Sequence, residues 1–171
     1  MASEIGVQTI QHTNGTDAMT IDSSGRVLTP ARPAFRLALG SVQSISSTNA
    51  TTLTFADQGA SDQCFIQGGF SVSSGVVTVP VAGVYSLHFA LRIDGVGSGN
   101  ITARMSVNNL ASGQNTIYVI SASPSSAQEN LTGSGVFKLD ANDTVRVTID
   151  SSADSSYNAN DRCEFSGFLV V

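Results

Sequence analysis

The clearest pattern in the sequence is an alternation of apolar and polar positions that recurs from residue 77 onward. In the segment 84–91 every second residue is large and apolar, namely Tyr85, Leu87, Phe89 and Leu91. The segments 101–107 and 144–149 show the same period of two residues. Successive side chains of a strand point to opposite faces, so this period predicts antiparallel strands with one buried face.

Short polar turns separate these runs. The turns are rich in glycine, serine, asparagine and aspartate, and they fall at Gly68-Gly69, 73–75, 95–99, Asn108-Asn109 and 140–143. Short strands joined by such turns favour a sandwich or a jelly-roll. The last segment, 165–171, is apolar on both faces, which predicts a central place in a sheet or a subunit contact.

The N-terminal stretch follows a different pattern. Pro30 and Pro33 divide the chain into an arm, residues 1–32, and a folded domain, residues 33–171. Two short apolar pieces with turns between them predict a β-hairpin or an extended arm. The arm has too few apolar residues to fold alone, so we expect it to bind something larger. Its candidate contact residues are Val7, Ile10, Met19, Ile21, Val27 and Leu28.

Composition narrows the possible partners. Charged residues make up only 12% of the chain and the net charge is −5, with the few basic residues scattered. This argues against nucleic acid as a partner, because such binding depends on clustered basic side chains. No segment is apolar enough to insert into a membrane. The first residues lack the charged and apolar regions of a signal peptide, so we expect synthesis in a cytoplasm.

No constellation of catalytic residues is present, and we expect the protein not to be an enzyme. The sequence contains no Gly-x-Ser-x-Gly elbow, no His-Glu-x-x-His and no phosphate-binding loop. His88 lies in the middle of an alternating strand, which favours a structural place on a sheet face. Cys64 and Cys163 match no zinc spacing. They are either two free buried thiols, the simpler interpretation, or a disulfide.

One segment between 150 and 161 has candidate ligand chemistry. Asp150, Asp154 and Asp161, with Asn158 and Asn160 between them, offer the oxygen ligands that calcium prefers. Their spacing fits no EF-hand, and a solvated connection is the simplest interpretation of an Asp- and Asn-rich segment. The same loop contains Tyr157, which could contact a receptor or a sugar. We expect no other cofactor.

Five segments follow the order of motifs in the C1q globular domain. They are 33–39, 74–85, 102–109, 139–145 and 165–169. The last reads Phe-Ser-Gly-Phe-Leu and resembles the closing strand of that family. The second is similar to Gly-x-Phe-x-x-Pro-x-x-Gly-x-Tyr, with Val77 in place of the usual Phe. The resemblance implies an all-β, ten-stranded antiparallel jelly-roll of the C1q/TNF type that forms a homotrimer, and some relatives bind calcium near the trimer axis.

The arm carries a second resemblance. Residues 14–30 look like segments that lead into surface domains of tailed-phage virion proteins. This resemblance implies a virion structural protein, a trimeric capsid decoration or head-fibre knob on the particle surface, anchored to a capsid or tail protein by its arm. Two alternatives stay open. One is the receptor-binding tip of a tail fibre that recognises a host glycan or protein, and the other is a cellular C1q-like adhesion module.

Overall fold

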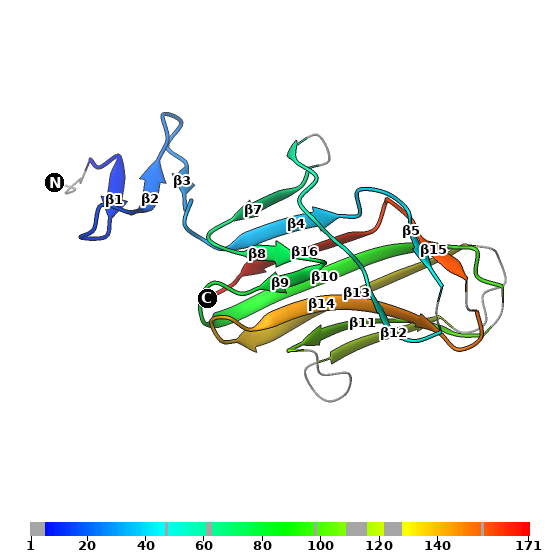
Figure 1. Ribbon diagram of the computed structural model, residues 1–171. Coiled ribbons are helices and arrows are strands. Elements are labelled where there is room, and N and C mark those ends of the chain that lie inside the picture. Colours follow the sequence, from blue (N-terminus) through cyan, green and yellow to red (C-terminus); the bar gives the residue numbers. More distant parts are fainter. Residues whose placement is uncertain are drawn as a thin grey trace.

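A computed structural model describes residues 6–46, 48–60, 63–97, 99–108, 116–121, 128–154 and 156–171. Within these ranges the labelled elements are all β-strands, β1 to β16 (Figure 1). The all-β prediction is confirmed. No helix in the described part of the chain is long and apolar enough to span a membrane.

Seven strands form the first of two facing sheets, which we call sheet one. They are β4 (Ala34–Ala38), β5 (Gln43–Ile45), β7 (Phe65–Gln67), β10 (Gly83–Asp94), β13 (Gln128–Leu139), β15 (Tyr157–Ala159) and β16 (Glu164–Leu169). The long strand β10 pairs with β13 over its whole length. On its other edge, β10 pairs with β16 and then with β15. Every pairing is antiparallel, and β16 lies between β10 and β4, which confirms the central position expected for the last strand.

The second sheet, sheet two, contains six strands. They are β6 (Thr51–Thr52), β8 (Ser71–Ser73), β9 (Val76–Thr78), β11 (Ile101–Val107), β12 (Thr116–Ser121) and β14 (Thr144–Ser151). Short strands such as β6 and β15 pair with the ends of long strands. Counted separately, they bring the described part of the jelly-roll above the ten strands that the resemblance implies. A two-residue turn at Ser74-Gly75 joins β8 to β9, and both residues have positive φ, as such hairpins favour.

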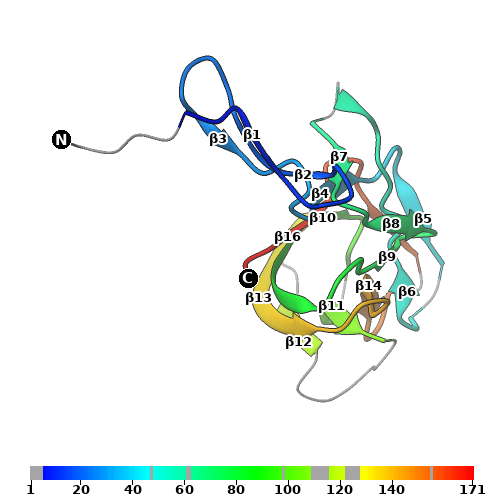
Figure 2. The ribbon, with the colours of Figure 1, turned by 90° about the vertical axis from the view of Figure 1, so that its left-hand side faces the viewer.

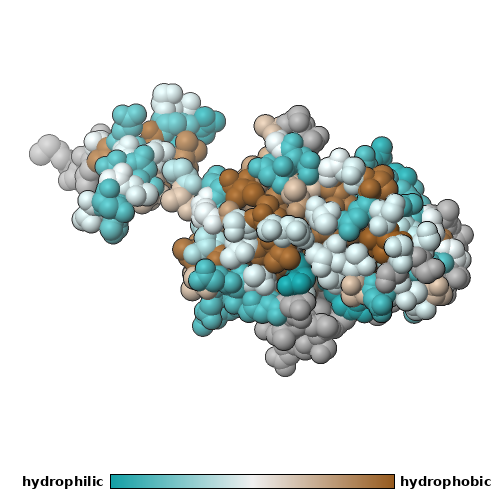
Figure 3. Space-filling model, in the orientation of Figure 1, coloured by the Kyte–Doolittle hydropathy of each residue, from teal (hydrophilic) through white to brown (hydrophobic). Residues whose placement is uncertain are grey.

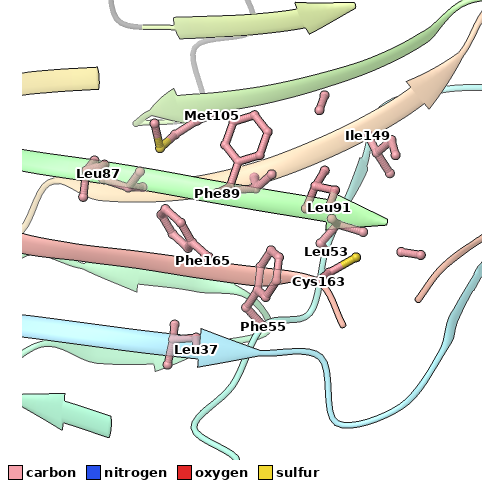
Figure 4. Close-up of a cluster of buried hydrophobic side chains, with 14 of the residues drawn as sticks. Leu37, Leu53, Phe55, Leu87, Phe89, Leu91, Met105, Ile149, Cys163 and Phe165 are labelled. Atoms are coloured by element: carbon pink, nitrogen blue, oxygen red, sulfur yellow. The ribbon is translucent and has the colours of Figure 1, made fainter. Parts of the chain in front are cut away.

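The core fills the space between the two sheets, and the alternation seen in the sequence determines which residues enter it. Tyr85, Leu87, Phe89 and Leu91 are all buried. The Phe35 ring meets the Phe165 ring edge to face, with the centroids 5.1 Å apart. Figure 4 shows Phe165 among other buried side chains of the core, including Leu87 and Phe89. Gly167 is needed beside them, because a Cβ at this position would overlap Leu87 and the Phe35 ring. The motif Phe-Ser-Gly-Phe therefore provides both a ring and the space beside it.

The arm forms a separate three-stranded antiparallel sheet, β1 (Thr9–Gln11), β2 (Asp17–Ile21) and β3 (Val27–Leu28). It therefore contains one strand more than the hairpin predicted from the sequence. The sheet stands away from the jelly-roll and joins it only at its base (Figures 1 and 2). There the Arg32 guanidinium donates to the carbonyl oxygens of Leu169 and Val170, at 2.7 and 2.8 Å.

Candidate functional site

The outward face of sheet one is the candidate site, and its middle consists of small uncharged side chains. Alternation in β10 turns Ser86, His88 and Ala90 away from the core, opposite the buried Tyr85, Leu87 and Phe89. The register places Ser166 of β16 on one side of His88 and Ser134 of β13 on the other. Because the side chains on these adjacent strands are short, another molecule could approach the backbone of sheet one closely here.

Large apolar side chains stand exposed on the same face. Phe168 of β16 is 49% exposed and Val136 of β13 is 69% exposed. Phe65 of β7 lies beyond β4, and the C-terminal Val170 and Val171 are also exposed. Figure 3 shows further apolar patches on the arm and along the side of the jelly-roll that faces the viewer. Exposed apolar side chains grouped in this way mark interaction surfaces.

Shallow hollows cover this face. One hollow of about 220 Å³ lies between Phe65 and Phe168, with Ser86, His88 and Gly167 among its lining residues. A smaller one of about 90 Å³ adjoins His88, Thr132 and Ser134. Serine, histidine and phenylalanine side chains line these hollows, which are large enough to receive side chains of a partner.

The end of the face away from the arm is charged. Arg36 donates to the Glu164 carboxylate, with Nη2 2.6 Å and Nε 3.2 Å from Oε2. Arg92 and Asp94 form a second pair at 3.1 Å. A hollow of about 320 Å³ lies beside Arg36 and Glu164 and is also lined by Asp161 and Arg162. Sheet one therefore carries apolar side chains toward the arm and ion pairs at the opposite end.

The three calcium candidates are not brought together by the fold. Asp150 lies in β14 on the outward face of sheet two and pairs with Arg104. Asp154 accepts a hydrogen bond from the Gly97 N–H at 3.3 Å. Asp161 lies in the turn before β16, beside the charged end of sheet one. The described residues contain no group of three or more His, Cys, Asp or Glu side chains placed to hold a metal ion.

Tyr157 is a core residue rather than a loop residue, which corrects the sequence-based expectation that it contacts a partner. It begins β15 and is only 2% exposed, because its strand alternates with Tyr157 and Ala159 turned inward. Burial and the nearby Asp154 carboxylate raise the pKa of Tyr157 to about 12. Its hydroxyl has no hydrogen-bond partner in the structure.

Cys64 and Cys163 are both buried, and they do not form a disulfide. Of the two alternatives left by the sequence, the structure therefore supports two buried thiols. Cys163 lies in the core just before β16, and its Sγ is 3.3 Å from the Arg92 carbonyl oxygen. Burial raises the pKa of the Cys163 thiol to about 11. Such a thiol stays protonated at neutral pH and is a poor nucleophile or metal ligand.

The arm residues expected to contact a partner divide between exposed and half-buried positions. Val7, Ile10, Val27 and Leu28 are exposed, whereas Met19 and Ile21 are half-buried. The register of the arm sheet places Ile10 opposite Met19 and Ile21 opposite Val27. Residue alternation identified the apolar positions, but only the pairing shows which of them share a face.

These features define a β jelly-roll with a hollowed outward face on sheet one. The chain belongs to the C1q domain family, whose model matches residues 39–170. The structure resembles crystal structures of murine APRIL at pH 5.0 (TM-score 0.61, 15% identity) and at pH 8.0 (TM-score 0.59, 16% identity). These matches cover 81% and 82% of this chain, and 99% of each APRIL chain, and at such low identity they support the fold alone. A comparison with curated proteins finds no match.

Proposed function

We propose that the chain is a homotrimeric C1q-like module that forms a structural head on the surface of a larger particle, to which its arm connects it. The observation that carries this proposal is the outward face of sheet one. It combines small neutral side chains, exposed phenylalanine rings and shallow hollows on one side of the molecule.

Burying this face against a second copy is physically favourable. Covering Phe168 and Val136 removes apolar surface from water, at about 25 cal/mol for each Å². The small residues around His88 let a neighbouring subunit approach closely. Arg36 and Arg92 already pair with carboxylates on the same face, so a neighbour need not supply partners for them. Family membership supports the same assembly, because C1q and TNF-like domains form homotrimers.

The particle we favour is a phage virion, with the module as a capsid decoration or head-fibre knob. The support is the resemblance of residues 14–30 to segments of tailed-phage virion proteins. The arm that contains this segment is structurally separate from the jelly-roll, as a connector needs to be. A free sheet edge at its outer strand offers main-chain groups to which a capsid or tail protein could add a strand.

Two other functions fit the same domain. C1q family membership is equally compatible with a cellular adhesion module. The hollows on the jelly-roll favour a receptor-binding tip of a tail fibre if the charged end of sheet one stays open in the assembly. Labelling intact particles with an antibody against the jelly-roll separates these functions in the electron microscope. Label on heads supports decoration, label confined to tails supports the receptor-binding tip, and antigen found only in uninfected cells supports the adhesion module.

Light scattering tests the homotrimer itself. The full chain is expected to show three times the mass of one chain. Ser134→Arg, in the middle of the proposed interface, is expected to shift the mass toward the monomer, because the interface would have to bury an unpaired charge. The matched control is Ser71→Arg, an exposed serine in a strand of sheet two, which is expected to leave the trimer intact. A monomeric wild-type chain, or equal effects of the two variants, would contradict the proposal.

A further inference from the structure

One face of the arm sheet is apolar, and no other described strand packs on it. Directly paired residues share a face, so Ile10 and Met19 lie on the same side, as do Ile21 and Val27. Met19 and Ile21 are two residues apart in β2 and therefore join the two pairs into one surface. We call these four side chains the apolar arm face. Ile10 is 48% exposed and Val27 is 55% exposed.

The jelly-roll of the same chain does not cover this face. The arm is held only at its base, where Arg32 bonds to the C-terminal carbonyls and Gln67 donates to the Arg32 carbonyl oxygen at 2.9 Å. A sheet of three short strands without a second layer buries too little apolar surface to be stable in water. The order of the arm therefore depends on a layer supplied by another molecule.

We propose that this layer is the same face of two further copies, so that three arms pack together as a neck on the axis of the trimer. The inference rests on the proposed homotrimer. The arm continues directly into β4, a strand of sheet one, and in Figure 2 it stands on the side of the barrel that carries β4 and β16. The exposed Phe168 and Val136 lie toward this end of sheet one, so the apolar surface runs from the proposed interface onto the arm.

The chemistry of the face suits identical partners. None of its four side chains is charged, so three copies meet without electrostatic repulsion. The charged groups of the arm lie outside it, and Asp22 and Arg26 already pair within one turn, at 2.7 Å. The opposite face carries Thr9 and Thr20, whose hydroxyls can stay hydrated on the outside of the neck, together with the exposed Leu28. Each arm then supplies one wall of a closed apolar interior.

Cysteine cross-linking tests the neck with two adjacent residues of β2. Met19 lies on the apolar arm face, and Thr20, which pairs with Thr9, points to the other side. Under mild oxidation, Met19→Cys is expected to form covalent dimers at least about tenfold faster than Thr20→Cys. The native Cys64 and Cys163 are buried and serve as an internal control in the wild-type chain, which should not cross-link.

The outcomes separate the neck from the trimer. If light scattering gives a trimer but the two variants cross-link equally slowly, the arms face some other partner and the neck is overturned, while the homotrimer stands. If the wild-type chain is monomeric, the homotrimer fails and the neck fails with it. A second pair of variants checks the result without oxidation: Met19→Asp should speed proteolysis between residues 6 and 32 several-fold, and Thr20→Asp should not. Equal proteolysis of the pair would also overturn the neck.

Discussion

The jelly-roll and the arm are built from the same kind of element, short antiparallel strands, but they place their apolar side chains in opposite ways. In the jelly-roll, Phe35 and Phe165 pack between two sheets and are almost inaccessible to water. In the arm, Ile10 and Val27 stand on an open sheet. Since layer-on-layer packing provides most of the stability of a β fold, the jelly-roll is stable by its own contacts. In the proposed neck the arm depends on contacts with the other copies, so changes that damage one region should leave the other intact.

Two glycines with nearly the same backbone conformation give the strongest test of this difference. Gly75 in the jelly-roll and Gly25 in the arm have φ of 76° and 77°. A Cβ at Gly75 would overlap the Leu53 carbonyl oxygen, whereas a Cβ at Gly25 meets nothing. We expect Gly75→Ala to reduce the free energy of unfolding by about 3 kcal/mol or more. Gly25→Ala should cost only the strain of positive φ, about 1 kcal/mol, and only in the arm.

Urea unfolding followed by circular dichroism measures both variants, at one protein concentration because an oligomer is stabilised by mass action. The Gly75→Ala midpoint should fall clearly, and the Gly25→Ala midpoint should stay at the wild-type value. A clear fall of the Gly25→Ala midpoint as well would mean that the jelly-roll and the arm unfold as one unit.

The alternation of residues was enough to predict the jelly-roll. Tyr85, Leu87 and Phe89 follow the two-residue period and all reach the core, since only one face of β10 is turned toward sheet two. The order of the motifs along the chain predicted membership of the C1q family, and the match to the C1q domain model over residues 39–170 confirms it. Where a strand is long and one of its faces is buried, the local pattern and the order of the motifs were therefore sufficient to predict its core residues.

The site was less predictable, because it depends on which strands become neighbours. Asp150, Asp154 and Asp161 are close in the chain, but β14 and the turn before β16 carry two of them to different sheets. Tyr157 looked like a loop residue because β15 is only three residues long and lies between polar segments. Ser134 and His88 are far apart in the sequence and become neighbours only through the β10–β13 register. No local pattern contains that information.

Alkaline pH should weaken the jelly-roll specifically, because the two groups with strongly raised pKa values, Cys163 and Tyr157, lie in its core. Burial raises the pKa of Cys163 from 9.0 to about 11, and the pKa of Tyr157 from 10.0 to about 12. Above about pH 9 the unfolded chain therefore loses the thiol proton while the folded chain keeps it. Protons bound preferentially by the folded state mean that stability is full below pH 9 and falls as the pH rises.

For Cys163 the loss between pH 9 and pH 11 is up to about 2–3 kcal/mol. Urea midpoints measured across this range should fall steeply for the wild-type chain. Cys163→Ala is expected to start from a lower stability, because it leaves a small cavity, but to fall less steeply with pH. A variant with the wild-type slope would show that the thiol does not titrate differently in the two states.

Acid should act on the other region, through Asp22 in the arm. This carboxylate holds the turn between β2 and β3 by accepting hydrogen bonds from the Arg26 N–H at 3.0 Å, the Arg26 guanidinium at 2.7 Å and the Ser24 N–H at 2.9 Å. The bonds from Arg26 lower the pKa of Asp22 below its ordinary 3.8. A lowered pKa means that the contribution of the carboxylate is present above about pH 4 and is lost as the pH falls through the shifted pKa. Because its partner Arg26 is 75% exposed, water screens the ion pair and the effect should be small.

Asp22→Asn reproduces the loss of charge at neutral pH. We expect the amides of Ser24 and Arg26 to exchange with deuterium a few-fold faster in this variant, while the amides of β10 and β16 exchange at the wild-type rate. The charge-assisted bonds of the turn become ordinary ones, and the arm has no core to compensate for the difference. Faster exchange in the jelly-roll as well would mean that the turn supports the whole molecule. Unchanged exchange in the turn would mean that the packing of the arm face, rather than its turn, keeps the arm ordered, and Met19→Asp should then have the larger effect on the same amides.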